Sequence, residues 1–135
     1  LESQTDKLDH YLHGYLLYAK ARLERYKDNP ESAIIPIVTG IEMFKRHKII
    51  QPYAVLLCEY GHLQLALEYP MEEIERNFAH AEALKNQLNV KDNSELGIAV
   101  GRLARAIKAY QRGEVLIIGS VAADLPEMVN KSLRL

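Results

Sequence analysis

Apolar residues recur every three or four positions along most of the chain, with polar residues between them. An α-helix turns once in about 3.6 residues, so this spacing predicts helices that each carry one apolar stripe facing the core. The first stripe comprises Leu8, Tyr11, Leu12, Tyr15, Ala19, Leu23 and Tyr26. It stops at "KDNPES", where Asn29 can cap a helix and Pro30 suits the first turn of the next one.

A second helix is predicted from Pro30 to about Lys48. Pro36 lies inside it, so we expect either a kink or a helix that begins near Pro36, because proline lacks the N–H that a helix interior uses. A third helix, from about Pro52 to Tyr69, is apolar nearly all round. That pattern is typical of a helix with neighbours on several sides.

Two amphipathic helices follow. The stretch "MEEIERNFAHAEALKNQLNV" (71–90) has an apolar stripe, with acidic residues in its first turns and Lys85 late, as the helix dipole favours. The next helix, from about 95 to 112, is capped by Asn93 or Ser94. The two stripes are Ile74, Phe78, Ala81, Leu84 and Leu88, then Leu96, Val100, Leu103, Ile107 and Tyr110.

The sequence pattern of the last part of the chain fits more than one kind of secondary structure. Residues 115–124 are rich in β-branched side chains and fit a strand or a helix. We favour a helix because every neighbouring segment is helical. Asp124 then caps a short C-terminal helix at 126–134.

These helices group into three consecutive pairs, at about 5–48, 52–89 and 94–124. Successive second helices are 41 and 44 residues apart, measured at Ala33, Ile74 and Ile118. Helix pairs at a regular period are the mark of an α-solenoid. The sequence therefore predicts an all-α fold: a single domain over 1–135, built as a right-handed α-solenoid of about three antiparallel helix pairs plus the C-terminal helix.

Several short motifs resemble tetratricopeptide repeats. "NFAHAEAL" (77–84) is similar to the second helix of that repeat, with its aromatic and small residues at Phe78 and Ala81. Gly61 stands about where the family has its close-approach glycine. "AIKAYQRGE" (106–114) resembles the end of the first helix and its turn, whereas the first pair offers only "ESAI" (31–34), with Gly40 at the small-residue position.

The steps between pairs exceed the family's period of about 34 residues, and HEAT-like pairs of roughly 40–47 residues remain the alternative. Long, degenerate repeats of this kind resemble the regulatory domains of peptide-responsive transcription regulators of Gram-positive bacteria. In those proteins a helix-turn-helix DNA-binding domain precedes the repeats. The chain begins at Leu1, which is compatible with its being a piece of a longer protein.

Composition narrows the function classes. Apolar residues make up 48% and charged residues 26%, as in an ordinary globular domain, and the net charge of −1 gives no reason to expect direct nucleic-acid binding. No apolar run approaches the roughly 20 residues that span a bilayer, so we expect no membrane partner. The lone Cys58 excludes an internal disulfide, and with the polar first residues it favours a cytoplasmic location.

Tyrosines give the clearest hint of a binding surface. All eight lie in or at the end of predicted first helices, which in solenoids of this kind line the concave face: Tyr11, Tyr15, Tyr18, Tyr26, Tyr53, Tyr60, Tyr69 and Tyr110. Their rigid rings and polar tips suit peptide recognition. We therefore expect ligand contacts from Tyr11, Tyr15, Tyr18, Arg22 and Tyr60. The alternative is that these rings pack between neighbouring helices.

Two further surfaces are candidates for a protein partner. Arg102 and Arg105 lie in a basic row opposite an apolar face, which suits a carboxylate, a phosphate or an acidic partner, or is only the solvated side of the helix. Leu125 and Met128 belong to an apolar C-terminal stretch. Terminal helices of solenoids normally carry a polar outer face, so this stretch indicates an interdomain or homodimer surface.

Two groups of residues have spacings that could form a catalytic or metal site, but each has an ordinary structural interpretation. Cys58 and His62 have the spacing of a thiolate–imidazole pair, and Asp6, His10 and His13 share a spacing compatible with a metal site. The competing interpretations are an inert buried thiol and surface histidines. No glycine-rich phosphate loop, G-x-S-x-G or H-E-x-x-H motif is present.

We therefore expect no enzyme activity, no metal and no cofactor. The sequence favours a regulatory or scaffold module that binds a peptide or a protein, of the kind that acts as the sensor domain of a transcription regulator. The alternative is an oligomerisation or interdomain module with no small ligand.

Overall fold

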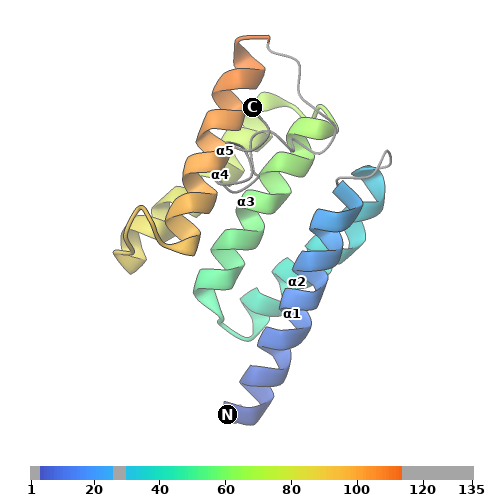
Figure 1. Ribbon diagram of the computed structural model, residues 1–135, viewed down its shortest axis with the longest axis vertical. Helices are drawn as coiled ribbons and strands as arrows, with labels where there is room; N and C mark the ends of the chain where they lie inside the picture. The colour runs from blue at the N-terminus through green and yellow to red at the C-terminus, as the bar shows by residue number, and fades with distance from the viewer. Residues whose placement is uncertain (1–3, 26–29, 114–135) are drawn as a thin grey trace, which may run out of the picture.

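The computed structural model describes residues 4–25 and 30–113, and these fold into five α-helices and one short 3-10 helix (Figure 1). The elements are α1 (Gln4–Arg25), η1 (Pro30–Ala33), α2 (Ile34–Arg46), α3 (Ile50–Ala66), α4 (Met71–Leu88) and α5 (Glu95–Gln111). The all-α class is confirmed for this part of the chain. The predicted helices at 115–124 and 126–134, with Leu125 and Met128, lie outside the described residues.

The second predicted helix starts later than its sequence pattern indicated. Pro30 to Ala33 form the 3-10 helix η1, and α2 begins at Ile34. Pro36 therefore occupies the first turn of α2, where its missing N–H leaves no hydrogen bond unmade. Of the two alternatives, a kink or a late start, the structure has the late start.

The helices form two layers, with α1, α3 and α5 toward the viewer in Figure 1 and α2 and α4 behind them. Helix α3 is central: it packs against α2, α4 and α5 and also touches α1. Every residue from Tyr53 to Leu65 except Tyr60 is buried. The prediction of neighbours on several sides of this helix is confirmed.

Helix α5 buries the face that its periodicity predicted, with Leu96, Val100, Leu103 and Ile107 all in the core. Helix α4 buries its stripe at Ile74 and Ala81 but leaves Leu88 at its end 39% exposed. None of the helices in the described ranges combines the length and the apolar character that a bilayer crossing requires.

The apolar face predicted for α1 is wrong in part. Gly14 and Ala21 are buried, whereas Leu12 and Leu23 are 53% and 57% exposed. A glycine at position 14 lets α1 lie directly on the ring of Phe44 in α2, so the helix turns its small residues inward. Its leucines are left on the opposite side.

Close approach through glycine recurs between other helices. A Cβ added at Gly40 would lie 2.8 Å from Leu56 Cδ1 in α3, and one at Gly61 would lie 2.6 Å from Leu103 Cδ2 in α5. Real Cβ atoms are not found so close to a neighbour. Gly61 therefore allows a close approach between helices, and the helix that α3 meets at this point is α5.

Three helices end without the glycine that usually allows a left-handed residue. Lys48, Glu68 and Asn89 have φ values of 56°, 57° and 52°. After α3, the amide of Tyr69 donates to the carbonyl of Gln64 and that of Glu68 to Leu65, at 2.9 and 3.2 Å. These are the paired bonds of a Schellman motif, which satisfies carbonyls that would otherwise have no partner at the helix end.

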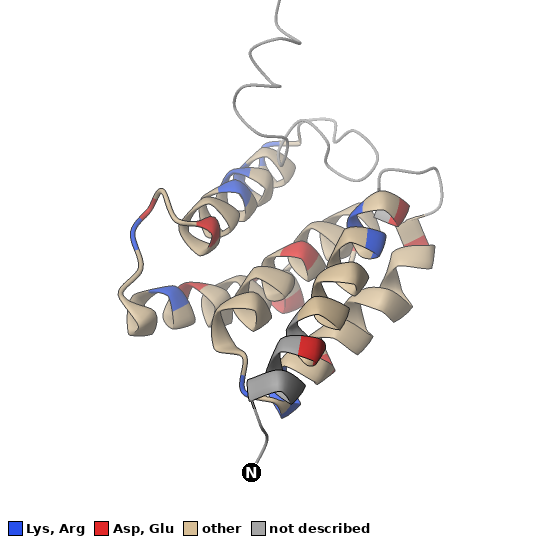
Figure 2. Cartoon of the chain, turned by 60° about the horizontal axis from the view of Figure 1, so that its bottom comes forward, with Lys and Arg blue, Asp and Glu red and all other residues tan. Residues whose placement is uncertain are grey.

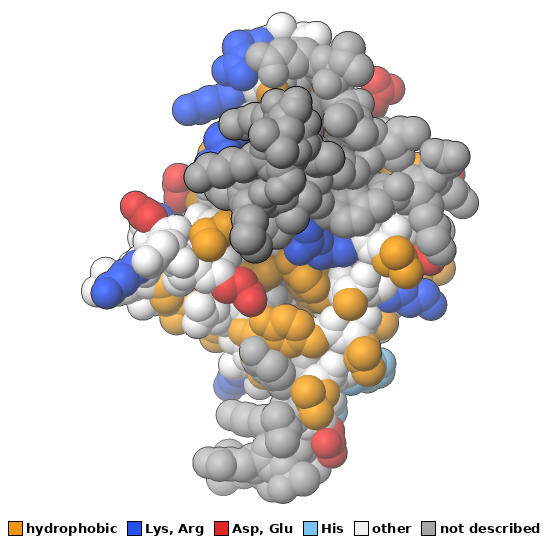
Figure 3. Space-filling model, viewed as in Figure 1, with side chains coloured by type: hydrophobic (Ala, Val, Ile, Leu, Met, Phe, Trp, Pro, Cys, Tyr) orange, Lys and Arg blue, Asp and Glu red, His pale blue; other side chains and the backbone are white. Residues whose placement is uncertain are grey.

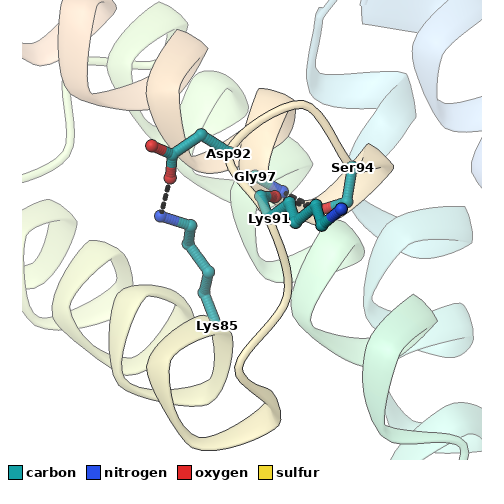
Figure 4. A network of polar contacts seen from close by, with 5 residues as sticks. All are labelled: Lys85, Lys91, Asp92, Ser94 and Gly97. Atoms are coloured by element: carbon teal, nitrogen blue, oxygen red, sulfur yellow. Dashed lines mark hydrogen bonds and ion pairs between the residues drawn. The ribbon is translucent and has the colours of Figure 1, made fainter.

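Figure 4 shows the turn between α4 and α5. The Ser94 hydroxyl accepts a hydrogen bond from the amide of Gly97 at 3.0 Å and donates one to the Lys91 carbonyl at 2.6 Å, so the serine is the cap of α5. Lys85 Nζ donates to Asp92 Oδ1 at 2.6 Å. This hydrogen bond, together with the charge of the ammonium, holds the pKa of Asp92 below its usual value.

Replacing Gly61 with alanine should destabilise the fold by about 1–3 kcal/mol, because the new methyl group would displace the buried Leu103. The matched control is Gly101→Ala on α5, where a Cβ meets only Arg105 Nη1 at 3.5 Å. That change should stabilise the helix by up to about 1 kcal/mol. Urea unfolding followed by far-UV circular dichroism measures both, and equal effects of the two changes would contradict the close approach of α3 and α5.

Candidate functional site

Helices α1, α3 and α5 meet around a small hollow with room for about 30 Å³, which is enough for a water molecule or the tip of one side chain. The groups around it are mostly polar although α3 is otherwise an apolar helix. They include Tyr18, Arg22, Cys58, Glu59, His62 and Arg102.

A buried ion pair lies at the centre of this group. Glu59 Oε1 is 3.6 Å from Arg22 Nε, and the two side chains are 5% and 27% exposed. A carboxylate removed from water costs several kcal/mol unless a partner stabilises it. The position of α1 beside α3 therefore supplies the positive charge that the buried Glu59 requires.

Tyr18 completes the α1 side of the hollow. Arg22 Nη1 donates to the Tyr18 hydroxyl at 3.4 Å, and the guanidinium carbon lies 5.7 Å from the ring centre. Burial raises the pKa of Tyr18, and the nearby Glu59 charge raises it further, against an opposing effect of Arg22. The phenol therefore stays neutral and can both donate and accept a hydrogen bond.

Tyr15 links α1 to α5. Its hydroxyl donates to Glu95 Oε1 at 2.7 Å, across 80 positions of sequence. Its ring centre lies 6.0 Å from that of Tyr18. Of the residues predicted to bind a ligand, Tyr15, Tyr18 and Arg22 thus lie together on one stretch of α1.

Tyr60 lies apart from them. Its ring meets the edge of Tyr69 at a centroid distance of 6.4 Å, and it does not line the hollow. Burial raises the pKa of Tyr60, and so do Tyr69 and the charge of Glu73 in α4. The structure therefore turns this tyrosine toward the start of α4. Tyr11 belongs to α1, but its side chain is outside what the structure describes.

The two arginines predicted to lie in a basic row have different environments. Arg102 is half-buried at the hollow, whereas Arg105 is exposed, as are Lys108 and Arg112, the basic residues that continue the row along α5. Figure 2 shows positively charged residues recurring along α5. Of this row, only the first residue shares a site with the tyrosines.

Sequence reasoning missed Glu59. A signal was available, because Glu59 and His62 are polar residues three positions apart within a helix predicted to be apolar nearly all round. Such residues cannot all reach solvent, so at least one had to be buried with a partner. In the structure both are buried, at 5% and 3% exposure.

Cys58, one of the candidate catalytic residues, has an environment that disfavours a nucleophile. Cys58 is 2% exposed, and burial together with the Glu59 charge raises the pKa of its thiol to about 12. A thiolate nucleophile needs a lowered pKa instead. Histidine His10 stacks on His47 with ring centres 3.5 Å apart. Within the described ranges, no three His, Cys, Asp or Glu residues are grouped so that they could hold a metal ion.

Comparisons of this chain with protein families, with curated proteins and with solved structures found no match.

The Cys58 thiol should react very slowly with a thiol reagent near neutral pH and fully after unfolding. Its raised pKa also predicts a pH effect on stability. The unfolded thiol loses its proton near pH 9, whereas the folded thiol keeps it to about 12. The contribution of this thiol to the free energy of unfolding is therefore fully present below pH 9. It falls by about 1.4 kcal/mol per pH unit as the pH rises toward 12.

Urea titrations at several alkaline pH values should show this fall in the wild-type chain and a shallower one in Cys58→Ala, which retains every other titrating group. Identical pH dependence in the two proteins, or rapid thiol reaction in the folded state, would contradict the buried position of Cys58.

Proposed function

We propose that the chain is a regulatory or scaffold module that binds a peptide or a segment of another protein. In this proposal it is a tetratricopeptide-like α-solenoid of antiparallel helix pairs, and α1, α3 and α5 are the first helices of successive pairs. Support comes from the layer that these three helices share in Figure 1 and from the central position of α3.

The hollow between α1, α3 and α5 is the observation that carries this proposal. The charged groups that line it are the guanidinium groups of Arg22 and Arg102 and the carboxylate of Glu59. Their net formal charge is +1. Guanidinium groups present paired donors that match a carboxylate. A peptide with an acidic side chain or a free carboxyl end is therefore the ligand that we expect.

The tyrosines would hold the rest of such a peptide. Tyr15 and Tyr18 lie next to the hollow, partly buried against the core, with hydroxyls engaged by Glu95 and Arg22. Rings held in this way provide contact area without losing much conformational freedom on binding.

A ligand at this hollow would touch three helices that belong to successive pairs. Each interface between neighbouring pairs in a solenoid is small and local, so binding can change the angle between pairs. That is how the module would pass a signal to a neighbouring domain. A sensor domain of a cytoplasmic transcription regulator is the setting that we favour.

A second candidate is an oligomerisation module. Three leucines on α1 support it: Leu12, Leu16 and Leu23 are all more than half exposed. Soluble proteins seldom leave such a row uncovered unless it meets a partner.

Selection of random peptides on the 135-residue chain tests the peptide proposal. The enriched peptides should carry acidic groups, and Arg102→Gln should weaken their binding about tenfold or more, measured by fluorescence anisotropy. Arg105→Gln is the matched control, because this arginine lies on the same helix but is exposed and outside the hollow.

The control variant should bind within about twofold of wild type, a difference well under 1 kcal/mol. Failure to enrich any peptide would contradict the proposal. So would peptides that bind wild type and Arg102→Gln equally well.

A further inference from the structure

A wide cleft lies between α1 and α2, and we name it the α1–α2 cleft. Its volume is about 460 Å³, which is in the range of sites that hold small organic molecules. In the space-filling view, histidine side chains (pale blue) lie beside apolar ones on the side of the molecule where these two helices run (Figure 3). The cleft is separate from the hollow, because the two share no lining residue.

Most of the polar side chains in the α1–α2 cleft are basic. His10 and His13 come from α1, and Arg46 and His47 come from the end of α2 and the residue after it. Three of the five histidines in the chain therefore line one cleft. Because histidine gains a positive charge near neutral pH, this concentration favours a negatively charged ligand. Thr39 adds a hydroxyl donor to the N–H donors of these four side chains.

The arrangement of two of the histidines favours an anion over a metal ion. His10 and His47 stack with ring centres 3.5 Å apart and ring planes 13° apart. The lone pair of an imidazole nitrogen lies in the plane of its ring, so nearly parallel rings do not aim their nitrogens at one metal ion. Protonation of both rings would bring two positive charges together, and a bound anion would offset their repulsion.

The end of α2 does not exclude an anion. The C-terminus of a helix has a partial negative charge, which comes from carbonyl groups without a partner. Here the amide of Ile49 donates to the carbonyl of Phe44 at 2.9 Å, and the amide of Lys48 donates to that of Lys45 at 3.2 Å. These hydrogen bonds occupy carbonyl groups whose charge would otherwise oppose an anion beside Arg46.

The other residues of the cleft indicate that the ligand is more than an inorganic anion. Val38 and Met43 supply apolar surface, and Glu42 supplies a carboxylate. An ionised carboxylate accepts hydrogen bonds and repels a second anion. Glu42 therefore suits a ligand that presents a hydroxyl group at one end and its negative charge at the other.

We propose that the α1–α2 cleft binds a small phosphate monoester with hydroxyl groups, either a sugar phosphate or a nucleoside monophosphate. The phosphoryl group has three strong acceptor oxygens, which match the donors of Arg46, His13 and the stacked histidines better than the two oxygens of a carboxylate do. Glu42 accepts a hydrogen bond from a hydroxyl group of the same molecule. The proposal does not depend on peptide binding at the hollow.

Isothermal titration calorimetry at about pH 6.5 tests the ligand class with four probes: AMP, ribose 5-phosphate, adenosine and inorganic phosphate. About 0.15 M salt screens exposed charges beyond roughly 8 Å. At least one of the two esters should bind saturably. Adenosine and inorganic phosphate should bind about tenfold more weakly or worse, because each lacks one part of the ligand. Tighter binding of AMP identifies a nucleotide site and equal binding of both esters a sugar phosphate site, and either result supports the proposal.

A pair of charge-removing variants tests the location. Arg46→Gln should weaken binding of the tighter ester about tenfold or more. The matched control is Lys45→Gln, which removes the same charge from the neighbouring exposed residue, outside the cleft. It should bind within about twofold of wild type. Circular dichroism establishes that both variants keep their helix content.

The pH dependence of binding tests the role of the histidines. The titratable side chains that line the cleft are His10, His13, Glu42, Arg46 and His47, and no described residue of α3 lines it. Asp9, Lys45 and Lys48 are near in the sequence but do not line it. Histidines are the side chains that ordinarily change charge between about pH 8 and 6.5. Affinity should therefore rise about tenfold over this range, while the ester, with a second pKa of about 6, stays mostly doubly charged. His13→Gln should reduce the rise.

Three results would overturn the proposal. One is the absence of binding by either ester up to about 10 mM. Another is binding of adenosine or inorganic phosphate as tight as that of the esters, or equal effects of Arg46→Gln and Lys45→Gln. The third is an affinity that does not rise as the pH falls, since that would exclude the histidines from the site.

Discussion

The structure depends on a charge placed inside its most buried helix. Helix α3 packs against α2, α4 and α5, yet Glu59 on it is only 5% exposed. A carboxylate in this position is tolerated only with a cation beside it. Arg22 supplies that cation from α1, so one ion pair links the placement of the first helix to the middle of the chain. A second buried polar residue of α3, Gln64, has a partner too: Asn77 Nδ2 donates to Gln64 Oε1 at 3.2 Å.

The same constraint explains why a hollow exists at this place. Two arginines and a glutamate line this junction, which has room for a small polar group among them. A purely apolar junction of α1, α3 and α5 would be more stable and would offer no recognition. In the proposed function this open space admits the acidic group of a ligand, and Tyr15 and Tyr18 would supply the contact area beside it.

Much of the fold was predictable because it follows from local rules. The bounds of α4 and α5 and the buried face of α5 follow from periodicity, and Ser94 is one of the two caps that helix-end chemistry predicted for α5. Helix α3 was predicted less well, because it begins at Ile50 and ends at Ala66 instead of running from Pro52 to Tyr69. The start of α2 was left open between two alternatives, and Pro36 in the first turn decided it. These features depend on residues within a few positions of each other.

Other features depend on which helix lies beside which, and these were missed. Tyr18 and Tyr60 both belong to predicted first helices, but Tyr18 faces the hollow and Tyr60 meets Tyr69. For α1, periodicity selected the larger apolar residues as the packed face. The ring of Phe44 instead lies on Gly14, because a surface of small residues allows the closer approach.

The most direct test of this account is a double-mutant cycle on the Arg22–Glu59 pair. Stability would be measured by urea unfolding for wild type, Arg22→Gln, Glu59→Gln and the double variant. We expect each single change to cost stability and the double change to cost less than their sum, with a coupling free energy of about 1 kcal/mol or more. Additive losses within about 0.3 kcal/mol would show that the pair does not hold α1 against α3 and would contradict the account.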